Sequence, residues 1–192
     1  MSFTPEHILS PDAVLRLFDL ASPPSSSPTA AGQDLVLLVE SKGTPIEGEC
    51  VRKFEDGKKR LNAMGYMIIT GLQVAPETGD PTVTTSDLIV VRQCDAASAS
   101  IASLLKNKTH DVNVVLSTFK SGGDPSLIAQ PTLEITIEKG RVAHFSVLTP
   151  SRLGGVPCEV ITFAHQGFKI NSAPQTTTGL RGAVRECYFA TK

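Results

Sequence analysis

The most regular hydrophobic pattern lies in the second half of the chain. Leu133, Ile135 and Ile137 alternate with polar residues. Lys139-Gly140 follows, and then a second apolar run at 142–148. A period of two predicts a strand with one buried and one solvated face, and the Lys-Gly pair predicts a turn between two strands. The polar side of the first strand consists of Thr132, Glu134, Thr136 and Glu138.

Six other segments have the apolar runs and flanking turn residues that are typical of strands. They are residues 34–41, 66–74, 87–93, 111–120, 158–170 and 185–191. In the fifth segment the large apolar residues change parity between Phe163 and Phe168, which predicts a bulge near Gly167. Residues 95–110 have the spacing of an amphipathic helix, with Asp95 as a cap. We therefore expect a mainly β fold, an antiparallel barrel or sandwich with one internal helix.

The N-terminal 32 residues differ from the rest of the chain. Residues 10–21 have the cap and the apolar spacing of a short helix, and residues 22–32 are uncharged and rich in Pro and Ser, as linkers are. The sequence predicts an N-terminal extension with a short helix (1–21), a linker (22–32) and one β domain (33–192). The helix either docks on its own domain or binds a partner, and the sequence leaves both open.

A charged and turn-rich segment, residues 42–65, separates the first two predicted strands. Loops of this length in compact domains are usually functional or disordered. Its basic residues Arg52, Lys53, Lys58, Lys59 and Arg60 are interleaved with Glu55 and Asp56. Because the acidic residues reduce the attraction to phosphate, we expect this loop to contact another protein and not nucleic acid.

The composition fits a soluble domain with an aliphatic core. Of the 192 residues, 41% are hydrophobic but only 5% are aromatic, and there is no Trp. The formal net charge of −1 gives the whole molecule no attraction to nucleic acid or to an anionic membrane. No apolar run approaches the roughly 18–20 residues that span a bilayer, and the start of the chain lacks the regions of a signal peptide. We expect synthesis in the cytosol and no stable membrane insertion.

No pattern of residues in the sequence indicates catalysis. The sequence lacks a nucleophile elbow and a phosphate-binding loop, and its histidines lack metal-ligand spacing. Cys158 and His165 would lie on opposite faces of one predicted strand. Glu134 and Glu138 share a face but would lie about 13 Å apart, further than paired catalytic carboxylates. We therefore expect no enzyme, no metal and no cofactor. Cys50, Cys94, Cys158 and Cys187 form no Cys-x-x-Cys motif and are expected to be ordinary thiols.

Five segments, in order, resemble the Hcp (haemolysin-coregulated protein) family, the tube protein of type VI secretion systems. Residues 36–50 resemble its first strand and the following Gly-Glu-Ser-like turn, with Gly48 and Glu49 at the matching positions. Residues 87–110 resemble the strand, aspartate, short helix and Gly-Lys-His-like exit, at Asp95, Leu104, Lys108 and His110. The other segments are residues 114–151, 158–170 and 185–192.

This resemblance implies a compact antiparallel β-barrel with one short α-helix on its side. In the family, six copies form a ring, rings stack into a hollow tube inside a contractile sheath, and the expelled tube can carry effectors. The resemblance implies a structural protein of the bacterial cytoplasm that is exported through the type VI secretion system without a signal peptide. Its partners would be further copies of itself, and sheath, baseplate or spike proteins and effectors.

The resemblance also implies roles for two sets of residues. The family's extended loop, which reaches a neighbouring ring or subunit, matches residues 43–65. The contact set there is Gly48, Glu49, Arg52, Lys53, Glu55, Asp56, Lys58, Lys59 and Arg60. The lumen-facing set is Thr132, Glu134, Thr136 and Glu138. The N-terminal extension, a second strand without Trp (YMIITGLQV) and an insertion at 124–130 depart from the family pattern and indicate a divergent member.

Two other functions fit the same pattern. One is the tube subunit of a phage-tail-like contractile injection system. The other is a monomeric, lipocalin-like β-barrel that binds a small ligand in an apolar interior pocket. Rings or short tubes in electron micrographs would support a tube subunit, whereas uniform monomers would count against it.

Overall fold

The computed structural model describes residues 34–74, 79, 81–119, 130–149, 155–174 and 182–190. The chain divides into two compact units, Met1–Gly32 and Gln33–Lys192, and all described residues belong to the second. The helix predicted at 10–21 and the linker at 22–32 lie outside the described residues, as does most of the insertion at 124–130. These three remain predictions.

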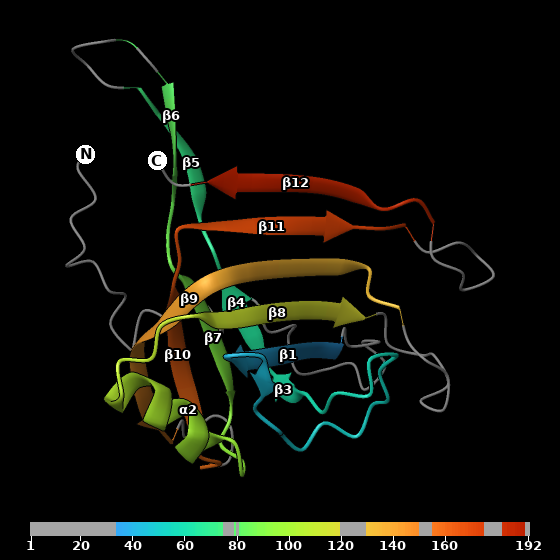
Figure 1. The fold of residues 1–192 in the computed structure, drawn as a ribbon, viewed down its shortest axis with the longest axis vertical. Coiled ribbons are helices and arrows are strands. Elements are labelled where there is room, and N and C mark those ends of the chain that lie inside the picture. The colour runs from blue at the N-terminus through green and yellow to red at the C-terminus, as the bar shows by residue number, and fades with distance from the viewer. Residues whose placement is uncertain are drawn as a thin grey trace. The chain divides into compact units, whose positions relative to one another are not determined.

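The described part of the chain consists of strands and one helix (Figure 1). The strands are β1 (Asp34–Ser41), β2 (Thr44–Pro45), β3 (Leu61–Ala63), β4 (Gly65–Met67), β5 (Thr70–Val74), β6 (Pro81–Thr85), β7 (Leu88–Gln93), β8 (Val112–Phe119), β9 (Leu133–Leu148), β10 (Cys158–Ala164), β11 (Gly167–Ser172) and β12 (Arg185–Ala190). The helix is α2 (Ser98–Lys106). The strands β1, β7, β8 and β12 begin and end within one residue of the predicted ones.

Ten of the strands form an antiparallel sheet that curls into a barrel. Its order is β2-β1-β8-β9-β10-β7-β4, with β3 on β1 and with β11 and β12 beside β9. No single strand pairs with both the β1 side and the β7 side of this sheet, because β3 pairs with β1 and β4 pairs with β7. Only Met64 separates β3 from β4, and its N donates to Val91 O on β7 at 2.8 Å, so the chain itself joins the two edges. The expected β-barrel with one short helix is confirmed, although its wall is not one closed ladder.

The turn predicted at Lys139-Gly140 is wrong, because residues 133–148 form one strand, β9, of 16 residues. Its first half pairs with β8 and β11 and its second half with β10. Lys139 has a φ of 53°, and a Cβ on Gly140 would lie 3.0 Å from Ala164 O. The two residues produce a tight bend where the strand passes from one side of the barrel to the other. Turns and strand bends both favour Gly and positive φ, so the sequence pattern did not distinguish them.

Two other predicted strands are divided in the structure. Residues 158–170 form β10 and most of β11, which are separated by His165-Gln166. The irregularity predicted near Gly167 is therefore present, but as a break and not as a bulge. β10 pairs with the second half of β9 and β11 with the first half, so both stretches of chain bend at the same corner. Residues 66–74 are split between β4 and β5, and β6 was missed because PTVTT contains a single large apolar residue.

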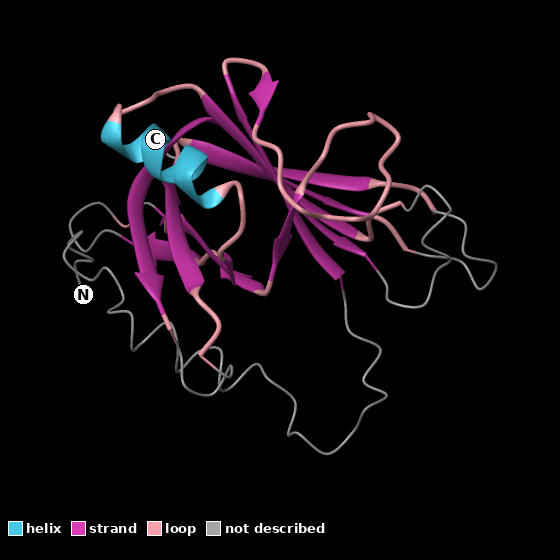
Figure 2. Ribbon diagram, turned by 90° about the horizontal axis from the view of Figure 1, so that it is seen from below, coloured by secondary structure: helices cyan, strands magenta, loops and turns pink. Residues whose placement is uncertain are grey.

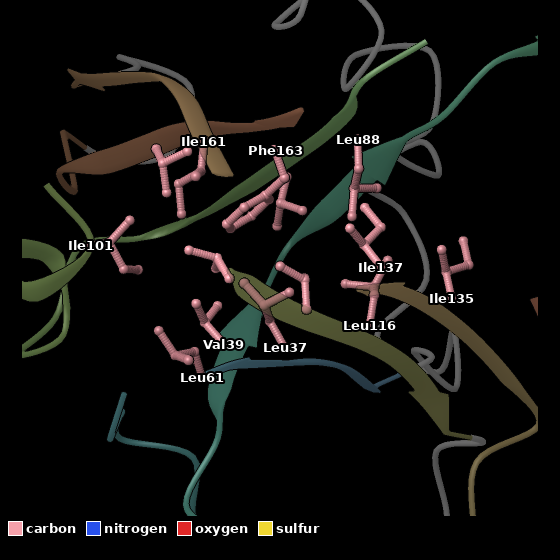
Figure 3. Close-up of a cluster of buried hydrophobic side chains, with 14 of the residues drawn as sticks. Leu37, Val39, Leu61, Leu88, Ile101, Leu116, Ile135, Ile137, Ile161 and Phe163 are labelled. Carbon is pink, nitrogen blue, oxygen red and sulfur yellow. The ribbon is translucent and has the colours of Figure 1, made fainter. Parts of the chain in front are cut away.

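The barrel interior is filled by mainly aliphatic side chains, as the low aromatic content predicts. Leu37, Leu116 and Ile137 come from three neighbouring strands, and they pack with Leu88 and Phe163 from the other side of the barrel (Figure 3). All five are at most 1% exposed. Side chains therefore occupy the space that an interior ligand would need, which counts against the ligand-binding barrel.

Helix α2 packs on this core through Ile101, which is fully buried, and it contacts β9. Figure 2 shows the helix lying across the strands of the sheet. The helix begins at Ser98, later than predicted, because Asp95 forms a turn before it. Asp95 Oδ1 accepts a hydrogen bond from Ala97 N at 2.8 Å, and Asp95 N donates to Ser98 Oγ at 3.0 Å. Ala97 directly precedes the helix and supplies no side-chain cap, whereas Asp95 satisfies an N–H group of the turn that leads into it, so the predicted capping role of Asp95 is confirmed.

Candidate assembly surfaces

The loop between β2 and β3, residues 46–60, lies on the outer side of the sheet. Phe54 in the middle of the loop packs against Phe119 of β8, with ring centroids 5.9 Å apart. Lys58 forms an ion pair with Glu40, which is on the outer side of β1. An apolar contact and a partly buried ion pair therefore hold the loop on its own barrel.

Arg60 fixes the end of this loop. Its Nη2 lies 2.9 Å from Asp56 Oδ2, and its guanidinium lies over the Phe54 ring, 4.1 Å from the centroid. Burial disfavours the ionised form of Asp56, but hydrogen bonds from Lys58 N and from Arg60 outweigh it, so the pKa of Asp56 lies below its usual value. The charges of Arg60 and Asp56 are therefore paired with each other within the loop.

The other basic residues of the loop differ in how available they are to a partner. Arg52 lies over the Phe119 ring, 4.9 Å from its centroid. Lys59 forms an exposed ion pair with Glu47 at 3.1 Å, and such pairs contribute little stability. Lys53 is exposed and has no ion pair with a described residue. Lys53 and Lys59 are therefore the most accessible cations of the predicted contact set.

Gly48 and Glu49 lie where the loop passes close to β3. A Cβ on Gly48 would lie 2.8 Å from Arg60 O and 2.9 Å from Leu61 Cγ, so only glycine fits there without a shift. Glu49 N donates to Asp95 Oδ2 at 3.4 Å. Two of the segments that carry the resemblance, the Gly-Glu turn and the aspartate before α2, therefore contact each other.

Asp95 also belongs to a buried ion network that the sequence pattern did not reveal. Arg92 on β7 is 1% exposed, and its guanidinium lies 2.5 Å from both Asp95 Oδ2 and Glu159 Oε1. Glu159 on β10 is 0% exposed. Burial works against the charge of Asp95, but hydrogen bonds from Arg92 and from Ala97 N outweigh it, so the pKa of Asp95 is lowered. The network connects the loop at Glu49 to two strands of the barrel.

The predicted lumen-facing set lies on the side of β9 opposite to the core residues Ile135 and Ile137, with its first member just before the strand. The set is Thr132, Glu134, Thr136 and Glu138. Glu134 is opposite Ser117 of β8, and their side-chain oxygens are 3.5 Å apart. The predicted alternation of β9 is therefore present, and it gives this part of the barrel a polar outer face.

The β5–β6 hairpin has an exposed apolar face. Among the described strands, β5 and β6 pair only with each other, and they extend beyond the main sheet (Figure 1). Leu72 and Val83 are directly opposite each other and next to Val74, with exposures of 68%, 44% and 60%. The other face contains Thr82 and Thr84. Because an isolated two-stranded hairpin is only marginally stable in water, the apolar face indicates a docking surface.

His165 connects the base of this hairpin to the barrel. Its Nε2 lies 3.0 Å from Ser86 O, so Nε2 carries the proton, since a carbonyl only accepts. Ser86 N donates to Ile69 O and Ser86 Oγ accepts from Ile69 N, both at 2.8 Å. The His165 ring also packs edge-on against Phe168, with centroids 5.6 Å apart. His165 therefore helps to fix both strands of the hairpin at their base.

The stability of the protein is expected to fall as His165 becomes protonated. Burial lowers the pKa of His165, so the folded protein takes up this proton less readily than the unfolded chain, where the pKa is about 6.5. The neutral His165 ring therefore makes its full contribution to the free energy of unfolding above pH of about 7, and this contribution is lost as the pH falls below about 6.5. Urea unfolding across this range, on wild type and on His165→Gln, measures it. The variant keeps an N–H donor but does not titrate, and an unchanged pH dependence would contradict the expectation.

Asp87, which interacts with His165, changes the pH dependence of the stability in the opposite direction. Burial raises the pKa of Asp87, while the charges of His165 and Arg141 lower it by less. A raised carboxyl pKa contributes stability that is present at low pH and lost as the pH rises through the folded-state value. Repeating the comparison in an Asp87→Asn background therefore separates the two groups.

The cysteines and potential metal ligands of the described part show no activated thiol and no ligand cluster. All four cysteines are free thiols, and burial raises the pKa of Cys94 and Cys158, which lowers their reactivity. No group of three or more His, Cys, Asp or Glu residues in the described part could hold a metal ion. None of its helices has the length and apolar character needed to cross a bilayer.

The β domain that contains these surfaces matches a known protein family. A family model described as "Type VI secretion system effector, Hcp" matches residues 38–171. The chain belongs to this family, which is one of type VI secretion tube proteins. The matched residues include the loop 46–60, the β5–β6 hairpin, the buried ion network and the polar face of β9. The comparison with curated proteins found no match.

Solved structures show the same fold at low sequence identity. A "type six secretion system protein" has a TM-score of 0.65 at 18% identity, over 83% of this chain and 96% of its own. Hcp1 from Salmonella typhimurium has a TM-score of 0.60 at 14% identity, over 82% and 95%. A type VI secretion system effector from Yersinia pestis has a TM-score of 0.54 at 18% identity, over 81% and 99%. At these identities the likeness shows the fold alone.

Proposed function

We propose that this chain is a structural subunit of the inner tube of a type VI secretion system. Copies form hexameric rings, the rings stack into a hollow tube that can carry effectors, and contraction of the sheath expels it. The observation that carries this proposal is the family match over residues 38–171. The exposed apolar face of the β5–β6 hairpin supports it, because a single copy leaves that face uncovered.

Two surfaces have separate roles in this assembly. The polar side of β9, with Thr132, Glu134, Thr136 and Glu138, faces the lumen, where a polar wall keeps the channel hydrated and limits adhesion of cargo. The loop 46–60 contributes to contact between rings through the set named above. Within it, Gly48 and Glu49 fix the start of the loop, whereas Lys53 and Lys59 present accessible charge. Charges of this kind give register and specificity more than affinity.

The proposal also includes the route and the partners of the protein. It is made in the bacterial cytoplasm and leaves through the secretion system without a signal peptide. Its main partner is itself, and the expelled tube also meets sheath, baseplate or spike proteins and effectors. No catalytic step is part of this function.

Electron microscopy and light scattering of the purified full chain test the proposal. We expect rings with about six times the mass of one chain, 20.4 kDa, and short tubes at higher concentration. Uniform monomers at high concentration would contradict it. Release into the medium only from cells with an intact sheath ATPase separates this function from that of a phage-tail-like injection system.

A further inference from the structure

Unusual backbone conformations are concentrated at one end of the barrel. Among the described residues, the non-glycine residues with a positive φ are Lys42 (51°), Lys108 (50°), Asp111 (68°) and Lys139 (53°). This conformation is uncommon outside glycine because the side chain crowds the backbone, and Asn and Asp adopt it more readily than other residues do. Asp111 is therefore ordinary in this respect, whereas three lysines with this conformation need a reason.

The sheet pairing brings the three lysines to the same end of the barrel. Lys42 comes directly after β1, whose last residue is opposite Val112 of β8. Val112 is also opposite Gly140, the residue after Lys139. Lys108 lies in the short connection between α2 and β8. Figure 1 shows the end of β1, the start of β8 and α2 on the same side of the barrel. We call these three lysines the lysine rim.

Two of the lysines occupy places where the local structure favours another residue. Lys42-Gly43 is the two-residue connection between β1 and β2, with a positive φ at both positions, and turns of this kind usually contain Asn-Gly. Lys139 lies at the bend of β9. Neither lysine forms an ion pair with a described residue. Their charges therefore stabilise neither the turn nor the bend through such a pair.

The third lysine ends helix α2. Lys108 N donates to Leu105 O at 3.0 Å, and Thr109 N donates to Leu104 O at 2.9 Å. In a helix end of this type, glycine usually occupies the left-handed position, which Lys108 occupies here. A lysine at this place also interacts favourably with the helix dipole. The other two lysines lie in a turn and in a strand bend, so the dipole accounts for one lysine of the rim and not for three.

We propose that the lysine rim binds an acidic face of another protein. Its three side chains are exposed, and Lys106 in the last turn of α2 adds a fourth exposed positive charge. Two exposed carboxylates, Asp111 and Glu138, lie among them, so the surface carries both signs with an excess of positive charge. Unfavourable backbone conformations persist where a side chain has a function. The surface belongs to a single barrel, so this inference does not depend on the proposed assembly.

The surroundings of the rim favour a protein over nucleic acid or a membrane. The carboxylates of Asp111 and Glu138 would repel phosphate groups. None of the large apolar side chains that are exposed in the described part of the chain lies in residues 41–43, 106–111 or 138–140. The rim therefore has no Phe or Tyr on which bases could stack and no apolar anchor for a bilayer. A mainly acidic protein surface that also carries basic side chains complements both signs of the rim.

Two triple variants separate binding from folding. Lys42→Asn/Lys108→Asn/Lys139→Asn removes the three charges and introduces a residue that adopts a positive φ more readily. Its midpoint of thermal unfolding should be no lower than that of the wild type. The Kd for a fluorescein-labelled Glu-rich peptide, measured by fluorescence anisotropy at low salt, should rise by about tenfold. Lys42→Arg/Lys108→Arg/Lys139→Arg keeps the charges and should bind the peptide as the wild type does.

The accessible lysines of the loop 46–60, Lys53 and Lys59, remain in both variants, so a loss of binding is due to the rim. Equal peptide binding by the Asn variant would overturn the inference, and so would a midpoint of thermal unfolding below that of the wild type, since the lysines would then serve the fold. Tighter binding of the wild type to duplex DNA or to phosphatidylglycerol vesicles than to the peptide would overturn it as well. The Asn variant should assemble as the wild type does, and a loss of assembly would make a second copy the partner and contradict the inference.

Discussion

Replacing Arg92 with methionine is expected to lower the free energy of unfolding by about 3–5 kcal/mol. Arg92 supplies the positive charge between Glu159, which is fully buried, and Asp95. Methionine fills a similar volume but leaves a buried carboxylate without a counter-charge, and removal of one partner from a buried pair is costly. For a chain of this size the midpoint of thermal unfolding should fall by about 6–20 °C.

The double variant Arg92→Met/Glu159→Leu separates lost packing from an unpaired charge. Replacing both partners of a buried pair with apolar residues is often neutral, so the double variant should recover most of the loss. Lys59→Met, which breaks only the exposed pair with Glu47, should cost less than about 1 kcal/mol. Urea unfolding of unassembled protein at one concentration measures all three. If the double variant is as unstable as Arg92→Met, the unpaired charge is not the cause.

The sequence could have indicated this pair of charges. Arg92 follows Leu88 and Val90 at the buried positions of β7, and Glu159 precedes Ile161 at the buried positions of β10. When each of two strands has a charged residue in line with its buried apolar residues, an ion pair between them is predicted, because buried charges need partners. The prediction also needs the two strands to be neighbours, and strand order depends on contacts between distant segments that the alternation within one strand does not encode.

The strands that could be predicted are those with a buried apolar side along their whole length, such as β1 and β8. Their period is set by the pleat, so it appears directly in the sequence. The bends at Lys139-Gly140 and His165-Gln166 could not be distinguished from a turn and a bulge, because the sheet pairing on either side decides between them. The β6 strand was missed because its side chains are mostly exposed, so no core selects an apolar alternation there. The same exposure makes the hairpin a candidate surface for contact with another protein. Strand prediction from hydrophobic alternation therefore fails at a surface with a proposed function.

Reversing the charge of Lys53 and Lys59 together is expected to prevent stacking while leaving folded rings. Lys58 and Arg60 are held by Glu40 and Asp56 within the chain, so changing them would also disturb the loop. Lys53 and Lys59 are exposed, and their replacement changes what a neighbouring ring meets without removing a buried contact. For Lys53→Glu/Lys59→Glu we expect rings of normal mass but few tubes in electron micrographs.

Lys106→Glu/Lys108→Glu is the matched control, because it makes the same change in net charge at the exposed end of α2 and its exit. That variant should form tubes like the wild type. If accessible charge acts between rings, wild-type tubes should also shorten at high salt, since the screening length falls from about 8 Å at 0.15 M to about 3 Å at 1 M. Tubes of full length from Lys53→Glu/Lys59→Glu would mean that the loop 46–60 lies away from the contact between rings. Its attachment to β8 through Phe54 and to β1 through Lys58 would then serve only the single barrel.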